Sequence, residues 1–262
     1  MANNSRDIEK GSEQYHEDAK GFRPPVQLTP EQYEQLFLQP GGRASIGTLS
    51  QRLGNPTPLA ILAYLLCLTP TACFLMGWGG SDATSMVTMV GAYYFVGGLI
   101  MVTAGVMEWV LGNTFPFVIF VSFGGFWLGF GLLQDPSHSL ASAFTDGSSS
   151  VQFNKGLMFY LAFWSVAGVI FFVASLRTNI VFAVILFTFT MVVTFLSVGY
   201  GYLGNGDVEF ATTIFTTAGA FAWVNACIAW YLEFSLIMAV VEMPFTVPLG
   251  DLSGFLVKVK TS

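Results

Sequence analysis

One carboxylate in this sequence lies where a charged side chain is costly. Glu108 belongs to the apolar stretch GVMEWVLGN, and no lysine or arginine occurs between Leu53 and Asn154. A carboxylate in such a segment needs hydrogen-bond partners or a watery cavity, because burying an unpaired charge is unfavourable. We therefore expect Glu108 to bond the region of Asn113 or Asn55. Its role is then either a structural clamp or a proton-linked gate.

A second candidate site lies where the first apolar stretch begins, in the sequence LGNPTPLA. Asn55 is a residue type that caps helices, and Pro56 suits the first helical position because its missing N–H is no loss there. We expect a helix to begin at Pro56, with free N–H groups and a positive dipole end. This end is either a well-capped helix terminus or a place where a small anion binds.

Two aromatic residues are distinguished by their depth in the membrane. Tyr64 lies nine residues beyond Asn55, which is about 13 Å along a helix. Phe123 lies eight residues beyond Phe115, or about 12 Å. Both rings are expected near the middle of the membrane, where opposing rings could form a narrow apolar gate.

Other kinds of chemistry lack the residues they need. The sequence has no glycine-rich phosphate loop, and its only two histidines are His16 and His138. No histidine and cysteine spacing suits a metal ion, and no nucleophile–base pair can be assembled at membrane depth. The net charge of −6 is spread over tails and loops and does not indicate a nucleic-acid partner. We expect no catalytic residues, no metal and no cofactor, and hence no enzyme.

The elements that must position these residues are membrane-spanning helices. The chain of 262 residues is 53% hydrophobic and 10% charged, with a mean hydropathy of +0.63. Because a spanning helix needs about 20 apolar residues that satisfy their own backbone hydrogen bonds, an all-α integral membrane protein is predicted. The six expected transmembrane helices lie near 57–77, 87–111, 115–133, 157–176, 179–199 and 211–232.

Lysine and arginine predict the orientation of these helices in the bilayer. Nine of the ten basic residues fall on one side of the predicted topology, and Lys155 falls on the other. Both termini are therefore expected in the cytosol. The expected organisation is a largely disordered cytosolic tail over 1–54, a transmembrane domain over 55–232, and a cytosolic or interfacial segment over 233–262.

Glycine predicts where helices pack closely. Small residues on one helix face allow close backbone contact inside a membrane, either within a protomer or between protomers. Two sets are found, a seven-residue repeat of Gly91, Gly98, Gly105 and Gly112, and a pair formed by Gly125 and Gly129. Residues 112–114 are expected to form a tight hairpin and residues 134–156 a longer outer loop.

Three motifs in order resemble one known family. NPTPLA resembles the Asn-Pro-Ala-Pro-Leu-Gly signature of the acetate uptake transporter family, which includes bacterial acetate/succinate permeases and fungal ammonia/acetate export proteins. The stretch MEWVLGNTFPFVIFVSFGGFWLGFG and the sequence LRTN also resemble that family, and the long N-terminal tail is similar to its fungal branch.

The resemblance implies a homohexamer of six-helix protomers, each with its own pathway for small monocarboxylates. The signature would line a cytosolic vestibule, which places Asn55, Pro56, Pro58 and Leu59 on the substrate pathway. The family's constriction combines aromatic residues of the first and third helices, which fall on Tyr64 and Phe123, with an aliphatic residue of the fifth helix that the motifs do not identify.

This chain is a divergent member by that comparison. Thr57 and Ala60 stand where the family has Ala and Gly, and Tyr64 and Phe123 stand where it more usually has Phe and Tyr. The gate hydroxyl has therefore changed sides, which bears on which solute is hydrogen-bonded.

The function that follows is a plasma-membrane transporter or channel for acetate-like short-chain monocarboxylates, linked to protons. Asn55, Asn113 and the first helix terminus would receive the carboxylate, Tyr64 and Phe123 would gate the methyl end, and Glu108 would set the proton dependence. One alternative is an exporter of ammonia or ammonium. Another is a membrane regulator that keeps the fold without transport.

Overall fold

The computed structural model describes residues 53–252, which form six helical spans and no β-strand. Each span is long and apolar enough to cross a membrane, so the predicted six-helix membrane fold is confirmed. Residues 1–52 of the expected tail and residues 253–262 lie outside the described residues. The spans are α3 (Thr57–Leu75), the run Ala83–Val110 that ends in α5 (Met101–Val110), α6 (Thr114–Gln134), α7 (Val151–Ser175), α8 (Ile180–Gly204) and α9 (Val208–Val240).

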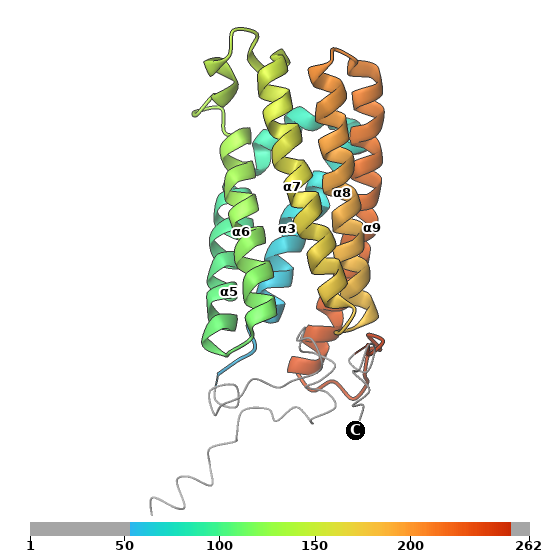
Figure 1. Ribbon diagram of the computed structural model, residues 1–262. Coiled ribbons are helices and arrows are strands. Elements are labelled where there is room, and N and C mark those ends of the chain that lie inside the picture. The colour runs from blue at the N-terminus through green and yellow to red at the C-terminus, as the bar shows by residue number, and fades with distance from the viewer. Residues whose placement is uncertain (1–52, 253–262) are drawn as a thin grey trace, which may run out of the picture.

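The spans are arranged around α3. Figure 1 shows α5 and α6 on one side of α3, and α7, α8 and α9 on the other. The chain enters α3 and leaves α9 at the same end of the bundle, here named the lower end. Ala60, Ala63 and Ala72 of α3 are at most 2% exposed. Small residues such as these let neighbouring helices approach α3 closely.

The second span is not the uniform helix that 87–111 predicted. A Cβ atom on Gly97 would lie 2.7 Å from Cγ of Trp127 and 2.8 Å from Sγ of Cys67, so only glycine allows this close approach. The Cys67 thiol donates to the carbonyl oxygen of Ala92 over 3.4 Å. A π-helical stretch is widened relative to an α-helix and is often found near functional sites. The span consists of a 3₁₀ helix η2 (Ala83–Met89), α4 (Val90–Ala92), the π-helical η3 (Tyr93–Ile100) and α5.

The first span begins one residue later than predicted. The N–H of Ala60 donates to the carbonyl oxygen of Pro56 over 3.2 Å, so Pro56 occupies the capping position and Thr57 is the first helical residue. The Asn55 side chain still satisfies a free helix N–H, because its Oδ1 accepts from the N–H of Thr57 over 2.9 Å. The expected role of Asn55 as the N-cap itself is therefore wrong.

Two other helix limits also differ from those expected. α7 already begins at Val151, so the outer loop is shorter than 134–156 and Lys155 lies in a helix. The Lys155 ammonium donates to the carbonyl oxygen of Gly201 over 2.8 Å and to Oδ1 of Asn205 over 2.7 Å. The last helix continues past Glu233 to Val240, beyond the expected end at 232.

The glycines that permit close packing are not all those predicted. A Cβ atom on Gly105 would lie 2.8 Å from Cγ2 of Val121, and one on Gly124 would lie 2.5 Å from Cγ2 of Val102. These contacts join α5 to α6. In contrast, a Cβ atom on Gly125 would meet nothing within 4 Å. Within the described chain Gly124, and not Gly125, therefore lies at a close helix contact. A role of the Gly125 and Gly129 pair between protomers stays a prediction.

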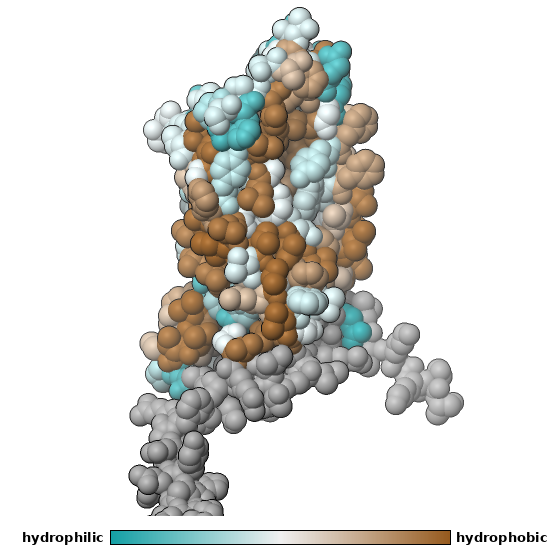
Figure 2. All heavy atoms as spheres, turned by 90° about the vertical axis from the view of Figure 1, so that its left-hand side faces the viewer, coloured by the Kyte–Doolittle hydropathy of each residue, from teal (hydrophilic) through white to brown (hydrophobic). Residues whose placement is uncertain are grey.

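The outer surface of the spans is apolar. On α7, Phe163 is 73% exposed and Ile170 is 62% exposed. Figure 2 shows the side that carries α5 and α6, where hydrophobic side chains cover the middle and hydrophilic ones gather at the upper end. Such a surface is suited to contact with lipid or with other apolar helices.

At the lower end the chain turns back after α9 and covers the start of α8. The N–H of Ile180 donates to the carbonyl oxygen of Gly250 over 2.7 Å, and the N–H of Leu252 donates to that of Thr178 over 2.8 Å. The segment 249–252 therefore provides an acceptor for an N–H in the first turn of α8, which has no acceptor within the helix.

Candidate functional site

A buried polar cluster lies at the lower end between α3, α5 and the start of α6. Glu108 is fully buried, and its carboxylate accepts hydrogen bonds from the hydroxyl of Thr57 and from Nδ2 of Asn113, the latter over 2.6 Å. Thr57 and Asn113 are themselves at most 1% exposed. Among residues 53–252, no lysine or arginine pairs with this carboxylate.

The hairpin between α5 and α6 positions this cluster. Gly112 has φ +84°, a left-handed conformation that glycine adopts without strain. The turn brings the N–H of Asn113 within 2.8 Å of the carbonyl oxygen of Glu108. Backbone and side chain of Asn113 therefore both bond the same residue. Of the two expected partners, Asn113 bonds Glu108 directly. Asn55 accepts from the N–H of Thr57, whose hydroxyl bonds Glu108.

An aromatic constriction lies above the cluster. The ring centroids of Tyr64 on α3 and Phe123 on α6 are 5.9 Å apart. Phe189 on α8 lies closer to Phe123, with centroids 4.4 Å apart and planes tilted by 33°. Tyr64 follows Thr57 by seven residues, so the constriction lies about 10 Å along α3 from the polar cluster.

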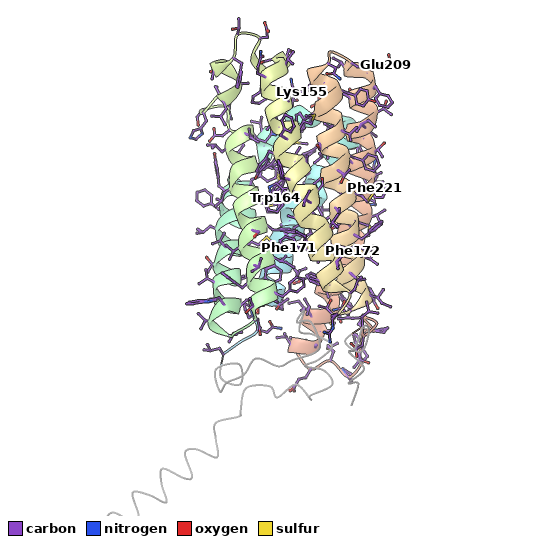
Figure 3. All side chains as sticks on the ribbon, viewed as in Figure 1. Lys155, Trp164, Phe171, Phe172, Glu209 and Phe221 are labelled. Atoms are coloured by element: carbon purple, nitrogen blue, oxygen red, sulfur yellow. The ribbon has the colours of Figure 1, made fainter. Side chains whose placement is uncertain are left out.

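Phe189 is an aromatic partner that the fifth span offers to Phe123, where the resemblance implied an aliphatic residue. Two aromatic side chains of α7 also pack against Phe123, whose ring centroid lies 6.0 Å from that of Trp164 and 6.3 Å from that of Phe171. Figure 3 labels Trp164 and Phe171 about midway along the bundle. Aromatic pairs at these separations stabilise one another beyond their burial.

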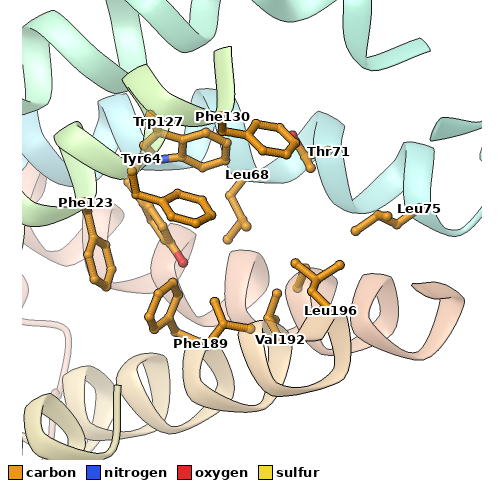
Figure 4. Close-up of a pocket in the computed structure, with 13 residues that line it drawn as sticks. Tyr64, Leu68, Thr71, Leu75, Phe123, Trp127, Phe130, Phe189, Val192 and Leu196 are labelled. Carbon is orange, nitrogen blue, oxygen red and sulfur yellow. The ribbon is translucent and has the colours of Figure 1, made fainter. Parts of the chain in front are cut away.

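An apolar pocket lies on the upper side of the constriction. Tyr64, Phe123 and Phe189 form one end of it, and the pocket continues upward past Leu68 and Val192, as Figure 4 shows. No charged side chain lines it. The lining residues with polar side-chain groups are Tyr64, Trp127 and Thr71, and the Thr71 hydroxyl is hydrogen-bonded to Tyr93 over 2.8 Å.

A buried amide holds the constriction to α8 and α9. Asn225 on α9 is fully buried, and its Oδ1 accepts a hydrogen bond from the hydroxyl of Tyr64 over 2.9 Å. Its Nδ2 donates to the carbonyl oxygen of Ile185 over 2.6 Å and to Oγ1 of Thr188 over 2.8 Å. One side chain therefore links three helices at the level of the gate.

The structure brings together some of the predicted site residues and separates others. Glu108 and Asn113 are in direct contact, and Tyr64 lies beside Phe123. Pro56 and Pro58 are buried near the polar cluster. Leu59 is 42% exposed on the outer surface of α3, away from these groups.

Sequence reasoning missed three polar contributors. Thr57 was noted only as a departure from the signature, yet its hydroxyl bonds Glu108. Asn225 is the one amide in the apolar stretch FAWVNACIAW, and a buried amide in a membrane helix must find partners. Glu233 belongs to none of the motifs, but it is only 5% exposed, and its Oε2 has no hydrogen-bond partner within the described chain. Among residues 53–252, no group of His, Cys, Asp and Glu could hold a metal ion.

Six spans enclosing an aromatic constriction between a polar cluster and an apolar pocket define a multi-pass membrane transport protein. The chain belongs to the GPR1/FUN34/yaaH family, whose sequence profile matches residues 37–254. The resemblance to the acetate uptake transporters, predicted from the motifs, is thereby confirmed.

Individual relatives agree with this assignment. The chain is 36% identical to the protein alcS of Aspergillus fumigatus over 88% of its own length and 86% of that protein. It is 30% identical to the acetate transporter protein patA of Aspergillus clavatus, over 77% of this chain and 79% of that one. The solved structure of the bacterial acetate channel SatP superposes with a TM-score of 0.61 at 25% identity, covering 76% of this chain and 99% of the channel.

Proposed function

We propose that this protein carries small monocarboxylates such as acetate across the plasma membrane. The observation that carries the proposal is the constriction of Tyr64, Phe123 and Phe189, which separates a polar cluster from an apolar pocket along the axis of α3. Relatives and a solved structure that are named for acetate support the choice of solute. The proposed activity is transport without a catalytic step.

The proposed path matches the two ends of a short monocarboxylate. Asn55, Asn113 and the N-terminus of α3 are proposed to receive the carboxylate at the lower end, where free helix N–H groups favour an anion. The apolar pocket accommodates the alkyl group. Because no lysine or arginine lines the pocket, a bound acid is held weakly and can leave quickly, as conduction requires.

Glu108 is proposed to couple transport to protons. It is a fully buried carboxylate next to Thr57, at the foot of the helix that carries the gate residue Tyr64. Protonation would convert one carboxylate oxygen from acceptor to donor, and the bonds from Thr57 and Asn113 would then have to change. In this way the charge of Glu108 could alter the packing of α3 against α5.

The test is initial uptake of labelled acetate at about pH 5–6 and at neutral pH in cells that lack other acetate systems. Wild type is compared with Asn55→Ala and Glu108→Gln at matched surface levels. We expect saturable uptake that is lost in Asn55→Ala, and uptake in Glu108→Gln that varies less steeply with pH than that of wild type. The matched control is Asn205→Ala, which removes an amide at the upper end.

The same cells discriminate the alternatives. Export or uptake of labelled methylammonium without acetate flux would favour an ammonium carrier. Altered membrane signalling on deletion, with no flux of either solute, would favour a regulator.

The proposed assembly is a homo-oligomer, a hexamer by the family resemblance. The exposed apolar face of α7, with Phe163 and Ile170, is available for contact with other copies. Native mass spectrometry of the purified protein tests this assembly, and a mass equal to one chain would contradict it.

A further inference from the structure

The hydrogen bonds around Asn225 determine which atom is the donor and which is the acceptor in its bond with Tyr64. The carbonyl oxygen of Ile185 can only accept, so the atom 2.6 Å away must be the amide nitrogen of Asn225. Oδ1 of Asn225 therefore faces Tyr64, and the Tyr64 hydroxyl must be the donor. Thr188 accepts from Asn225 and donates to backbone oxygens of α8, over 2.8 Å to that of Val184.

The Tyr64 bond is the one bond of this network that a solute can replace. Asn225 and Thr188 are otherwise bonded to each other and to the backbone of α8. Tyr64 lines the pocket, and Figure 4 shows its ring beside Phe123 and Phe189 at the pocket's end. Ala222, one turn from Asn225 on α9, also lines the pocket. Asn225 itself is fully buried and does not line the pocket, so a small solute in the pocket meets Tyr64 first and approaches the bond to Asn225 from the Tyr64 side.

We propose that the pair Tyr64 and Asn225 passes the neutral, protonated form of a short carboxylic acid and rejects its anion. The acid can insert between the two side chains, because its carbonyl oxygen accepts from the Tyr64 hydroxyl while its own O–H donates to Oδ1 of Asn225. Both buried groups then remain bonded. This inference rests on the proposed function and specifies the form of the substrate that crosses the gate.

A carboxylate cannot make the same replacement. It has only acceptors, so it takes the proton of Tyr64 and leaves Oδ1 of Asn225 buried without a donor. Its charge would also enter a pocket that no charged side chain lines. Both effects disfavour the anion at the constriction, and neither applies to the neutral acid.

No ionisable group of the described protein is placed to compensate for that charge. Apart from Tyr64, no titratable side chain lines the pocket. The elements packed around the pair carry Cys67 and Cys73 on α3, Tyr93 and Tyr94 on η3, Lys155 and Tyr160 on α7, Tyr200 and Tyr202 on α8, and Glu209, Cys227 and Tyr231 on α9. The Tyr93 hydroxyl is bonded to Thr71. Glu233 lies eight residues from Asn225 along α9, about 12 Å away. Glu108 lies beside Thr57, about 10 Å from Tyr64 along α3. Selection of the neutral form therefore falls to the two hydrogen-bonding groups themselves.

The experiment uses purified full-length protein in liposomes that contain a pH-sensitive dye, with the membrane potential set by potassium and valinomycin. Initial influx of labelled acetate and internal acidification are measured at equal pH on both sides, and the flux of protein-free liposomes is subtracted. We expect one proton released inside per acetate, and less than a twofold change in rate when about 100 mV is applied. Tyr64→Phe should lower the acetate flux about tenfold, because the acid loses the hydroxyl that donates to its carbonyl oxygen.

Matched variants separate the role of the hydroxyl from general damage. Tyr93→Phe also removes a buried hydroxyl and its bond to Thr71, but Tyr93 does not line the pocket, so its flux should stay within about twofold of wild type. Tyr64→Phe combined with Asn225→Leu should be no slower than Tyr64→Phe alone, because the two side chains act as one unit.

The outcomes distinguish this inference from the proposed function. Acetate flux that follows the potential and carries no proton would overturn the selection of the neutral acid, and so would a Tyr64→Phe variant with unchanged flux and proton ratio. Absence of acetate flux in folded, correctly inserted wild-type protein would overturn the proposed function itself. The potential and proton measurements on wild type decide the question even if a variant does not fold.

Discussion

The phenolic hydroxyl of Tyr64 on α3 donates a hydrogen bond to Oδ1 of Asn225 on α9 over 2.9 Å, and both side chains are buried. Asn225 also bonds Ile185 and Thr188 of α8. The position of the gate ring is therefore coupled to the packing of two other helices. A change in the gate must alter this network or break its bond to Tyr64.

Asn225→Leu should destabilise the protein by about 1–2 kcal/mol, because the Tyr64 hydroxyl loses its buried acceptor. Unfolding of the purified protein in mixed micelles measures the change. The double variant with Tyr64→Phe should cost less than the sum of the single variants, since Tyr64→Phe removes the group that Asn225→Leu leaves unpaired. Strict additivity would contradict the direct coupling.

Phe123→Leu should relax the size selectivity of uptake. The smaller side chain loses contacts with Tyr64 and Phe189, and the constriction widens. We expect the rate for a four-carbon acid relative to acetate to rise about tenfold, which corresponds to about 1.4 kcal/mol. Competition between labelled acetate and butyrate measures it. Phe163→Leu, on the exposed face of α7, is the control, and an equal change in both variants would place the effect outside the gate.

Glu108→Gln should be milder than Glu108→Ala. A glutamine can accept from Asn113 and donate to the Thr57 hydroxyl, which can reverse its role and accept. We expect Glu108→Ala to cost about 1–3 kcal/mol, because the hydroxyl of Thr57 and Nδ2 of Asn113 both lose their bond to the carboxylate, and Glu108→Gln to cost less. Thermal unfolding in detergent compares them. Adding Thr57→Ala to Glu108→Gln should remove the advantage, and equal losses for Gln and Ala would argue against these bonds.

Gly124→Ala and Gly125→Ala form a matched pair on α6. The new methyl group at 124 would lie 2.5 Å from Cγ2 and 2.9 Å from the backbone nitrogen of Val102, whereas at 125 it would meet nothing within 4 Å. We expect Gly124→Ala to destabilise by about 1–3 kcal/mol and Gly125→Ala to be neutral or slightly stabilising in an isolated protomer. The folded fraction after detergent extraction reports both. A reversed order would show that α5 and α6 pack differently.

Asp135 at the upper end should contribute a pH-dependent part of the stability. The hydroxyl and the N–H of Ser137 donate to its carboxylate over 2.6 and 2.8 Å and lower the pKa of Asp135 below its usual value. Because the pKa is lower in the folded state, this stabilisation is present above the unfolded pKa, near 4, and is lost as the pH falls through the folded pKa. The melting temperature of Asp135→Asn should therefore fall less than that of wild type below about pH 4. Asp146→Asn, in the same loop, is the control, and parallel curves for Asp135→Asn and wild type would refute the expectation.

The predicted site and the observed site differ in instructive ways. Glu108 could be found because a lone carboxylate in an apolar run must be bonded, and Tyr64 and Phe123 because helix rise converts sequence position into depth. Asn225 and Phe189 could not be selected from position, since one is distant in sequence and the other is one of 26 phenylalanines. The same holds for Gly124, whose neighbour Gly125 fits the small-residue pattern equally well.

The sequence by itself determined the number of spans, their helical nature and the location of Glu108 in an apolar run without lysine or arginine. These features follow from continuous apolar runs, because a helix in lipid must satisfy its own backbone groups whatever its neighbours are. Only the tertiary structure decided which side chains meet: Tyr64 with Asn225, Thr57 with Glu108, and Phe123 with Phe189. The rotation of each helix about its axis depends on packing against all the others, and in a uniformly apolar helix no polar face in the sequence reveals it.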